Sequence, residues 1–419
     1  MSFKILNLHP NLLRGVAALG FDAPTPIQRD AVPPILRGRD VLACAVTGSG
    51  KTAAFILPIL ERLLEHPRGI TRALVLAPTR ELAAQIDEHR QQLGRHTSLT
   101  GAAVFGGVGY APQEQALRHG VDVLVATPGR LLDHLGHFRG CLARLEVLVL
   151  DEADRMLDMG FLPAIRRVLQ HLPERRQTLL FSATLPPPIV ALAREILRDP
   201  VNIAVERRAA PAAGITHTAY PVASELKSRL LLQLLARPAT RSVLAFTRTK
   251  HRANRLTEFL GRHGIRAERI HGNRSQAQRT QALAGFKAGR FQVLVATDIA
   301  ARGIDIDALS HVVNFDVPPL PEDYIHRVGR TARAEARGDA LTLVAPNEEA
   351  DLHTIERAIG ARIVRVTLPD FDYGQRLSER LEIPLAERLA AIRVERAGPR
   401  RRAVREWRRA TTDRITRGV

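Results

Sequence analysis

The 419-residue sequence has only two cysteines, four tyrosines and one tryptophan, and it contains no long apolar run. Cys44 and Cys141 are too few for a disulfide framework or an all-cysteine metal site, which favours a reducing compartment. The fifteen histidines show no ligand spacing with either cysteine, so we expect no zinc site. No stretch of about 18 consecutive apolar residues exists, which excludes a membrane-spanning helix. The first residues, Met1–Lys4, lack the apolar core of a secretory signal, and we therefore expect a cytoplasmic protein.

Lysine is also scarce, because arginine supplies all but five of the 61 basic residues. With 43 acidic residues the formal net charge is +18. A strongly basic globular protein usually meets a polyanion, and the planar guanidinium group suits phosphate. Arginine and alanine enrichment is also what a biased genome composition produces, so a basic surface without a specific partner is the alternative. A composition of 45% apolar and 25% charged residues excludes wholesale disorder.

Short apolar runs alternate with longer amphipathic stretches along most of the chain. In the first half we expect strands at Val41–Cys44, Ala73–Leu76, Val121–Ala126, Leu145–Leu150 and Thr178–Phe181. Apolar runs without polar alternation are typical of strands buried on both faces of a parallel sheet. Helical patterns such as Arg80–Leu93 and Leu162–Gln170 separate these runs, so the sequence predicts βαβ units.

The second half of the chain repeats the plan of the first. The letters VLVAT occur at Val123–Thr127 and again at Val293–Thr297, and VLAPT at Val75–Thr79 is echoed by VLAFT at Val243–Thr247. Two matches in the same order predict two related α/β domains in tandem. We place these domains at residues 1–205 and 216–369, with a linker at 206–215 and a C-terminal extension at 370–419.

The C-terminal extension is disproportionately basic. Arg396–Val419 carries nine arginines against two acidic residues, a net charge of +7 in 24 residues. Trp407 lies among these arginines and can stack on a nucleic-acid base while they hold phosphates. A tail helix that packs this tryptophan on the core is an equal alternative, because Leu381–Val394 has apolar residues at helical spacing.

The sharpest local signal is the segment Ala45–Thr52 (AVTGSGKT), directly after an expected strand and before a helical stretch. Small residues let backbone N–H groups surround phosphate oxygens at a helix N-terminus. Lys51 would reach the β- and γ-phosphates of a nucleotide, and the Thr52 hydroxyl would ligate Mg²⁺. Ala45 stands where the general phosphate-loop pattern has glycine. A flexible turn with an incidental lysine is the alternative to this phosphate loop.

Acidic and basic residues that suit phosphoryl transfer occur elsewhere in the chain. The fourth expected strand ends in Asp151–Asp154 (DEAD), where Asp151 is placed to hold Mg²⁺ and Glu152 to polarise the attacking water. A solvated helix N-cap is the alternative reading of these acids. In the second half, Arg330 and Arg333 can stabilise charge on the γ-phosphate, and they share one helical face if that stretch is helical.

From Phe3 to about Ala345 these motifs, in this order and spacing, resemble the DEAD-box ATP-dependent RNA helicases. The tetrad Asp151–Asp154 gives that family its name, and Ala45 is the family's own form of the phosphate loop. The resemblance implies two tandem RecA-like α/β domains, each with a parallel sheet flanked by helices, which bind ATP and Mg²⁺ in the cleft between them. Ala332 stands where glycine is commoner in the family.

The resemblance also implies the role of individual residues. ATP would contact Phe21, Gln28, Ala45, Val46, Thr47, Gly48, Ser49, Gly50, Lys51, Thr52 and Asp305. RNA would contact Thr79, Arg80, Gly106, Gly107, Thr127, Arg130, Thr297, Arg302 and Gly303. Ser182 and Thr184 would couple hydrolysis to strand separation, Thr52 and Asp151 would hold the metal, and Lys51, Asp151, Glu152, Arg330 and Arg333 would be catalytic. Gln276 and Arg279 match a further element of the second domain.

The implied function is RNA-stimulated ATP hydrolysis coupled to local, largely sequence-independent unwinding or remodelling of RNA duplexes or RNA–protein complexes. An ATP-gated RNA clamp or assembly scaffold with little unwinding is one alternative, and a DNA helicase is another. The segments His271–Gln276 and Val317–Tyr324 look most like the bacterial RhlE-type branch. We therefore expect RNA as the partner, together with ribosome-assembly or RNA-degradation machinery.

Overall fold

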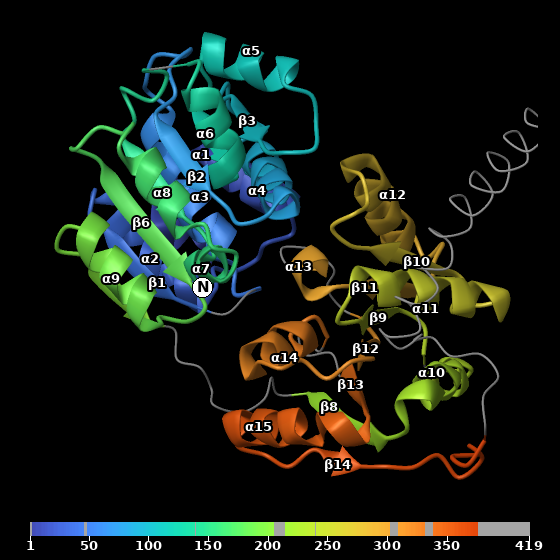
Figure 1. The fold of residues 1–419 in the computed structure, drawn as a ribbon. Helices are drawn as coiled ribbons and strands as arrows, with labels where there is room; N and C mark the ends of the chain where they lie inside the picture. The colour runs from blue at the N-terminus through green and yellow to red at the C-terminus, as the bar shows by residue number, and fades with distance from the viewer. Residues whose placement is uncertain are drawn as a thin grey trace, which may run out of the picture.

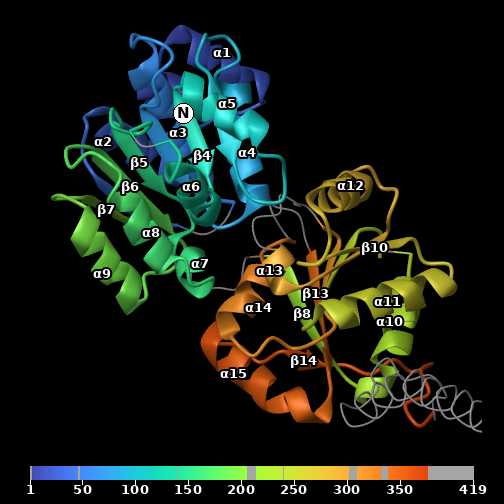
Figure 2. The same ribbon diagram turned by 45° about the horizontal axis from the view of Figure 1, so that its top comes forward.

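The computed structural model describes residues 2–45, 48–138, 140–204, 214–238, 240–301, 309–331 and 338–375. These residues form two α/β domains, each built on a seven-stranded sheet whose strands all run parallel. In Figures 1 and 2 the first domain is coloured blue to green and the second yellow-green to red, with helices on both faces of each sheet. The prediction of two tandem α/β domains with parallel sheets is confirmed. None of the described helices has the length and apolar character that crossing a bilayer requires.

The first sheet has the strand order β3-β4-β2-β5-β6-β1-β7. Its strands are β1 (Val41–Cys44), β2 (Ala73–Leu76), β3 (Gly101–Val104), β4 (Val123–Ala126), β5 (Val147–Leu150), β6 (Gln177–Ser182) and β7 (Val201–Ala204). Its helices are η1 (Phe3–Leu6), α1 (Pro10–Ala18), α2 (Pro26–Leu36), α3 (Lys51–Leu63), α4 (Arg80–Leu93), α5 (Ala111–His119), α6 (Pro128–Leu135), α7 (Ala153–Asp158), α8 (Leu162–Leu169) and α9 (Pro187–Ile196).

Alternate residues of each strand supply the two apolar layers of this domain. Val75 and Val125 pack with α1 to α4 on one face of the sheet. Leu74 and Leu124 pack with α5 to α9 on the other. Because both faces are covered, the strands contain few polar residues, which is the pattern that the sequence showed.

The second sheet has the strand order β10-β11-β9-β12-β13-β8-β14. Its strands are β8 (Ile215–Pro221), β9 (Val243–Phe246), β10 (Ala267–Ile270), β11 (Val293–Ala296), β12 (His311–Asn314), β13 (Gly338–Val344) and β14 (Val364–Arg365). Its helices are η2 (Ser224–Leu226), α10 (Lys227–Leu235), α11 (Lys250–Arg262), α12 (Gln276–Lys287), α13 (Asp298–Ala301), α14 (Pro321–Val328), η3 (Pro346–Glu348) and α15 (Glu349–Ile359).

The two sheets correspond strand for strand. Strands β1 to β7 of the first sheet correspond in turn to strands β8 to β14 of the second, and the two spatial orders are then the same. The repeated VLVA letters form β4 and β11, which hold the same place in their sheets. The echoed letters likewise fall at β2 and β9: Val75 and Leu76 are the last two residues of β2, and Val243 and Leu244 are the first two of β9. The sequence repeat therefore reflects a duplicated architecture.

Two strands begin later than the sequence predicted. Strand β4 starts at Val123 because the carboxylate of Asp122 accepts hydrogen bonds from the Thr100 backbone and hydroxyl at 2.7 and 2.9 Å. Strand β5 starts at Val147, after Glu146 has paired with Arg72. In both places an acidic side chain forms a hydrogen bond or ion pair with a neighbouring segment, just before the first residue of the strand that pairs in the sheet.

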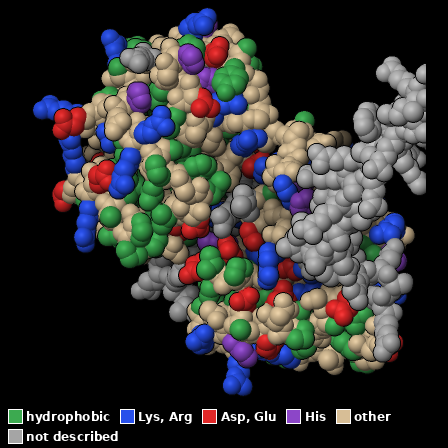
Figure 3. All heavy atoms as spheres, in the orientation of Figure 1, with side chains coloured by type: hydrophobic (Ala, Val, Ile, Leu, Met, Phe, Trp, Pro, Cys, Tyr) green, Lys and Arg blue, Asp and Glu red, His purple; other side chains and the backbone are tan. Residues whose placement is uncertain are grey.

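The domain limits also differ slightly from those expected. Ile215, assigned to the linker, is the first residue of β8. Phe371 is buried in the second domain's core, so packing continues past the predicted end at Pro369. Residues 205–213 and 376–419, which include most of the predicted linker and basic extension, lie outside the described residues. On the face in Figure 3, Lys and Arg side chains are spread over both domains with acidic side chains among them.

Candidate ATP-binding site and RNA-facing surface

The predicted phosphate loop joins the end of β1 to the start of α3. Gly50 has a φ of +92°, in the left-handed region that favours glycine, and this turn directs the chain into the helix. The Lys51 ammonium group donates a hydrogen bond to the Ala45 carbonyl at 2.9 Å and is buried. Val46 and Thr47 lie outside the described residues. The loop therefore has the strand, turn and helix N-terminus that phosphate binding requires.

The start of α2 lies against this loop. Gln28 caps its own helix, because the Thr25 N–H donates to the Gln28 side-chain oxygen at 3.0 Å. The Gln28 amide nitrogen donates to the Gly50 carbonyl at 3.1 Å. Phe21 is 39% exposed and stacks on Phe3, with ring centroids 6.5 Å apart. Gln28, which was expected to contact ATP, thus links the start of α2 to the phosphate loop.

The first two acids of the DEAD segment lie at the end of β5. Burial raises the pKa of Asp151 to about 7, although the nearby Lys51 opposes this shift. Glu152 has a φ of +53°, an uncommon conformation for a residue other than glycine. Its carboxylate pairs with Arg155 at 3.1 Å. Both acids are held in fixed, buried positions, and backbone strain at Glu152 is typical of functional sites.

The last acid of the segment connects to the predicted coupling residues. The Asp154 carboxylate accepts hydrogen bonds from the Thr184 N–H at 2.8 Å, the Thr184 hydroxyl at 2.9 Å and the Ala183 N–H at 3.1 Å. Ser182 joins the same network through its hydroxyl, which contacts the Asp154 N–H at 3.1 Å. Burial opposes ionisation of Asp154, but the hydrogen bonds from Thr184 hold its pKa below the ordinary value. The network rigidly ties the DEAD segment to the loop after β6.

A cavity of about 580 Å³ collects residues from both domains. A volume of this size suits a nucleotide. Its lining includes Phe21, Gln28, Gly48, Gly50, Lys51, Thr52, Asp151 and Glu152 from the first domain and Arg330 from the second. The structure therefore brings together most of the described residues that were expected to contact ATP.

Arg330 lies in a turn rather than in a helix. Helix α14 ends at Val328, and Gly329 follows it as the C-cap. The condition for a shared helical face with Arg333, a helical stretch at Arg330, is therefore not met, because the helix has already ended. Arg333, Asp305 and Ala332 lie outside the described residues.

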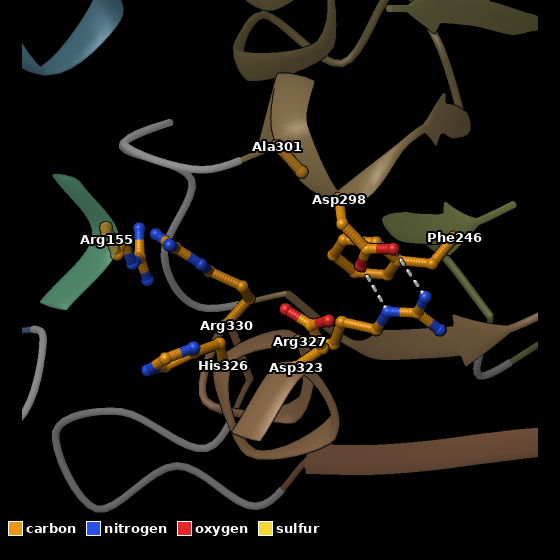
Figure 4. Close-up of a pocket in the computed structure, with 8 residues that line it drawn as sticks. All are labelled: Arg155, Phe246, Asp298, Ala301, Asp323, His326, Arg327 and Arg330. Carbon is orange, nitrogen blue, oxygen red and sulfur yellow. Dashed lines mark hydrogen bonds and ion pairs between the residues drawn. The ribbon is translucent and has the colours of Figure 1, made fainter. Parts of the chain in front are cut away.

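A small pocket beside Arg330 is lined by residues of the second domain and by Arg155, which directly follows the DEAD segment. His326, Arg330 and Arg155 line it, and in Figure 4 Arg330 extends toward Arg155. Burial, with a further contribution from Arg155, lowers the pKa of His326 to about 4, so this histidine is neutral at pH 7. Arg327 is held by Asp298 through two contacts of 2.6 and 2.8 Å.

The first domain's predicted RNA-contacting residues follow strand ends and turns. Thr79 is the N-cap of α4, and its hydroxyl accepts the Leu82 N–H at 3.2 Å. The Arg80 guanidinium lies against the turn of Gly106 and Gly107, and an added Cβ at Gly107 would collide with it. Gly107 also has a φ of +82°, in the left-handed region that favours glycine, so its backbone conformation makes the turn depend on glycine and the Arg80 side chain packs against it.

The other predicted RNA contacts among the described residues are buried or only partly exposed, as Thr79 also is. Thr127 is the buried N-cap of α6. The Arg130 side chain is only 10% exposed. Thr297 follows β11, where its N–H donates to the Ile270 carbonyl at 3.4 Å. Arg302 and Gly303 lie outside the described residues.

The two domains also meet through Glu81, which the site prediction did not include. Its buried carboxylate accepts a hydrogen bond from Gln276 at 2.9 Å and pairs with Arg279 at 2.9 Å. Glu81 directly follows Thr79 and Arg80, which were predicted to contact RNA, and its partners lie in the first turn of α12. The sequence indicated both segments as functional, but no pattern in it showed that they lie in contact.

Gln85 and His89, also missing from the prediction, line the nucleotide cavity from α4. Their spacing of four residues places them on one face of that helix. This spacing was visible in the sequence, but nothing in it indicated that the face lay toward the cavity.

Comparisons with known proteins agree with this geometry. Residues 25–192 match the DEAD/DEAH box helicase family, and residues 226–335 match the helicase conserved C-terminal domain. The DEAD-box ATP-dependent RNA helicase CshA of Bacillus cereus is 41% identical over 388 residues, covering 93% of this chain and 73% of CshA. The chain belongs to the DEAD-box ATP-dependent RNA helicases. Its function as an RNA-stimulated ATPase and RNA helicase follows from that membership.

Two further relatives are similar to this DEAD-box helicase, one in sequence and one in both sequence and fold. The DEAD-box ATP-dependent RNA helicase RhpA of Helicobacter pylori is 41% identical over 374 residues, covering 89% of this chain and 76% of RhpA. The structure of S. cerevisiae Dbp5 bound to RNA and ADP BeF3 is similar with a TM-score of 0.80. That comparison has 34% identity and covers 88% of this chain and 96% of Dbp5.

Proposed function

We propose that this DEAD-box helicase uses ATP and Mg²⁺ for local, largely sequence-independent unwinding or remodelling of RNA, through approach of its two domains. One observation carries the proposal: Lys51, Asp151 and Glu152 share a cavity with Arg330 from the other domain. A ligand that contacts both domains favours the arrangement in which they are close. ATP and RNA together would therefore bring the domains together, and hydrolysis would release them.

The cavity supports a distinct chemical role for each residue. Lys51 would bind the β- and γ-phosphates at the start of α3. Glu152 would orient and polarise the attacking water, and its contact with Arg155 holds it in place. Arg330 would stabilise the charge that develops on the γ-phosphate, as an arginine from a second element does in other phosphoryl-transfer sites.

The residues present fit a magnesium ion. The Asp151 carboxylate and the Thr52 hydroxyl both line the cavity, and Mg²⁺ prefers such oxygen ligands together with phosphates and water. Burial raises the pKa of Asp151 to about 7, and a divalent cation would favour its charged form. When bound, Mg²⁺ supplies neutralisation of charge on the β- and γ-phosphate oxygens.

Steady-state ATPase assays with and without single-stranded RNA test the proposal. We expect RNA to stimulate hydrolysis, and K51A and E152Q to lower the stimulated rate by about a hundredfold or more. E152Q should still bind ATP, because the substitution keeps the side chain's shape but removes its basicity. The control is E195Q, which removes an exposed carboxylate that does not line the cavity and should leave the rate unchanged.

Equal ATP hydrolysis with and without RNA would contradict the proposal. Stimulation by DNA of the same sequence, but not by RNA, would favour a DNA helicase. A partial-duplex displacement assay distinguishes unwinding from clamping, because a clamp would bind RNA tightly with ATP and release no strand.

We also propose a place for this helicase among its relatives and in the cell. The second-domain segments His271–Gln276 and Val317–Tyr324 support the RhlE-type branch, which a phylogeny containing CshA and RhpA sequences tests. A cytoplasmic location and work in ribosome assembly or RNA degradation follow from that placement. Cosedimentation of the protein with ribosomal precursor particles, compared with the K51A variant, tests the first of these processes.

A further inference from the structure

The connection between β3 and α5 exposes two large apolar side chains. Val108 is 39% exposed and Tyr110 is 49% exposed, directly after the turn of Gly106 and Gly107. In Figures 1 and 2 this connection runs along the side of the first domain that faces α12. Exposed apolar groups placed together usually mark a contact surface.

Tyr110 is held in place by its neighbours. The Arg130 guanidinium lies 4.1 Å from the centre of the Tyr110 ring, within the range of a cation–π contact. Arg130 also donates a hydrogen bond to the Val108 carbonyl at 3.3 Å, which ties the connection to α6. His134 meets the ring edge-on, with centroids 5.2 Å apart. The aromatic ring is therefore preorganised while about half of the residue stays in contact with solvent.

This arrangement changes what Arg130 offers to RNA. Its side chain is 10% exposed, so the guanidinium supports the ring more than it presents a surface for phosphate. The Arg80 guanidinium lies against Gly106 and Gly107 of the same connection and adds a second cation there, while the Asp133 carboxylate lies 3.9 Å from Arg130. A rigid aromatic ring beside cations matches the way single-stranded nucleic acid is bound, with stacked bases and nearby phosphate contacts. An apolar protein partner would gain nothing from these neighbouring cations.

We propose that Tyr110 forms a stacking platform for one unpaired base of the bound RNA. The base would lie on the exposed part of the ring, and Arg130 would hold the ring from its other side. The contact adds base stacking to the phosphate and sugar contacts of the neighbouring motifs, without reading sequence, because every base has a π-face. This inference rests on the proposed RNA-binding function and names a residue that the predicted RNA contacts did not include.

Binding of a short fluorescein-labelled single-stranded RNA, in the presence of a nonhydrolysable ATP analogue, tests this role by fluorescence anisotropy. We expect Y110A to weaken RNA binding about tenfold, while Y110F retains wild-type affinity because it keeps the ring. The matched control is V364A, which truncates another exposed apolar side chain on β14 and should bind RNA normally. The slope of affinity against salt should stay the same in Y110A, because no phosphate contact is lost.

A second comparison separates stacking from a structural role of the loop. RNA with abasic sites should bind the wild-type protein more weakly than intact RNA, and Y110A should bind both equally. In the Y110W/W407F protein, which has one tryptophan, intact RNA should quench the fluorescence and abasic RNA should not. Wild-type affinity in Y110A, or an undiminished preference of Y110A for intact RNA, would overturn the stacking role alone. Failure of the wild-type protein to bind RNA would overturn the proposed function as well.

Discussion

Lys227, one of only five lysines in the chain, has a fully buried side chain. Its ammonium group donates to the Phe315 carbonyl at 2.9 Å, pairs with Glu348 and lies 3.9 Å from Asp316. Burial lowers the pKa of Lys227, whereas the two carboxylates favour its charged form. Asp316 in turn accepts the Arg248 N–H at 2.8 Å, at the start of the turn that leads into α11. This lysine therefore orders the ends of β9 and β12.

Replacement of Lys227 tests how much the buried charges depend on one another. K227M should lower the free energy of unfolding of the second domain by about 3 kcal/mol, because Glu348 and Asp316 lose a buried partner and keep Arg248 at 3.4 Å and Arg252 at 3.2 Å, respectively. The double variant K227M/E348Q should recover part of that loss, since one of those charges is then removed. Urea unfolding of the full-length protein measures both effects. A loss of under about 1 kcal/mol in K227M would show that Arg248 and Arg252 compensate the two carboxylates without the lysine.

The strand–turn–helix unit of β1 and α3 places the phosphate loop. Gly50 begins the helix with a φ of +92°, and an added Cβ there would lie 2.5 Å from the Gln28 amide nitrogen. Gly50 thus begins helix α3 and also leaves room for the Gln28 side chain at the start of α2. Larger side chains are excluded both by backbone conformation and by this close approach.

G50A should strain the turn and displace Gln28, and it should weaken ATP binding by at least about tenfold. Gly264 provides the matched control, since its φ of +78° is similar but no atom lies within 4 Å of an added Cβ. G264A should cost about 1 kcal/mol of stability with unchanged ATP affinity. Titration with a fluorescent ATP analogue compares the two variants. Equal ATP affinity in both would show that contact with Gln28 has no influence on the loop.

At the scale of the whole molecule, the two domains meet through a few buried polar contacts. Glu81 joins the first domain to Gln276 and Arg279, while His326 and Arg330 lie beside the DEAD segment. Charged groups of this kind are costly to bury unless they stay paired. The relative placement of the domains is therefore sensitive to single substitutions and to pH.

The Glu81–Arg279 pair should stabilise the observed placement of the domains. E81A and R279A should each raise the population of separated domains, because the remaining partner would be buried without its counter-charge. The double variant should separate no further than either single variant, since both remove the same contact. Single-molecule energy transfer between labels on the two domains measures these populations. Additive effects would show that the two residues act independently.

Acidification should also separate the domains. His326 has its pKa lowered to about 4 in the buried site, against an ordinary value of 6.5. Below pH 6.5, His326 binds a proton when the domains are separated but not when it is buried between them. The free energy that favours the observed placement of the domains over separated domains therefore falls by about 2 kcal/mol by pH 5. The same energy-transfer measurement from pH 7.5 to 5 should show increasing separation in the wild type and a flatter response in H326Q. Identical profiles would assign the pH response to other groups.

Much of this architecture could be predicted because contiguous residues carry it. Apolar runs and amphipathic stretches indicated β2 and α4 with their observed limits, and the VLVAT repeat indicated two equivalent sheets. The phosphate loop and the DEAD segment were recognised because each is a short string whose chemistry depends on adjacent residues. Strand starts at Val123 and Val147 were missed because side-chain partners distant in sequence, such as Thr100 for Asp122, determine them.

The sequence by itself determined the fold class, the family and the chemistry of the phosphate loop, since these follow from local periodicity and ordered motifs. Only the tertiary structure decided that Glu81 pairs with Arg279, that His326 is buried near Arg155, and that Arg130 supports Tyr110. These contacts join segments far apart in the chain or on different elements. Their partners are chosen by how helices and sheets pack, which no local pattern in the sequence encodes.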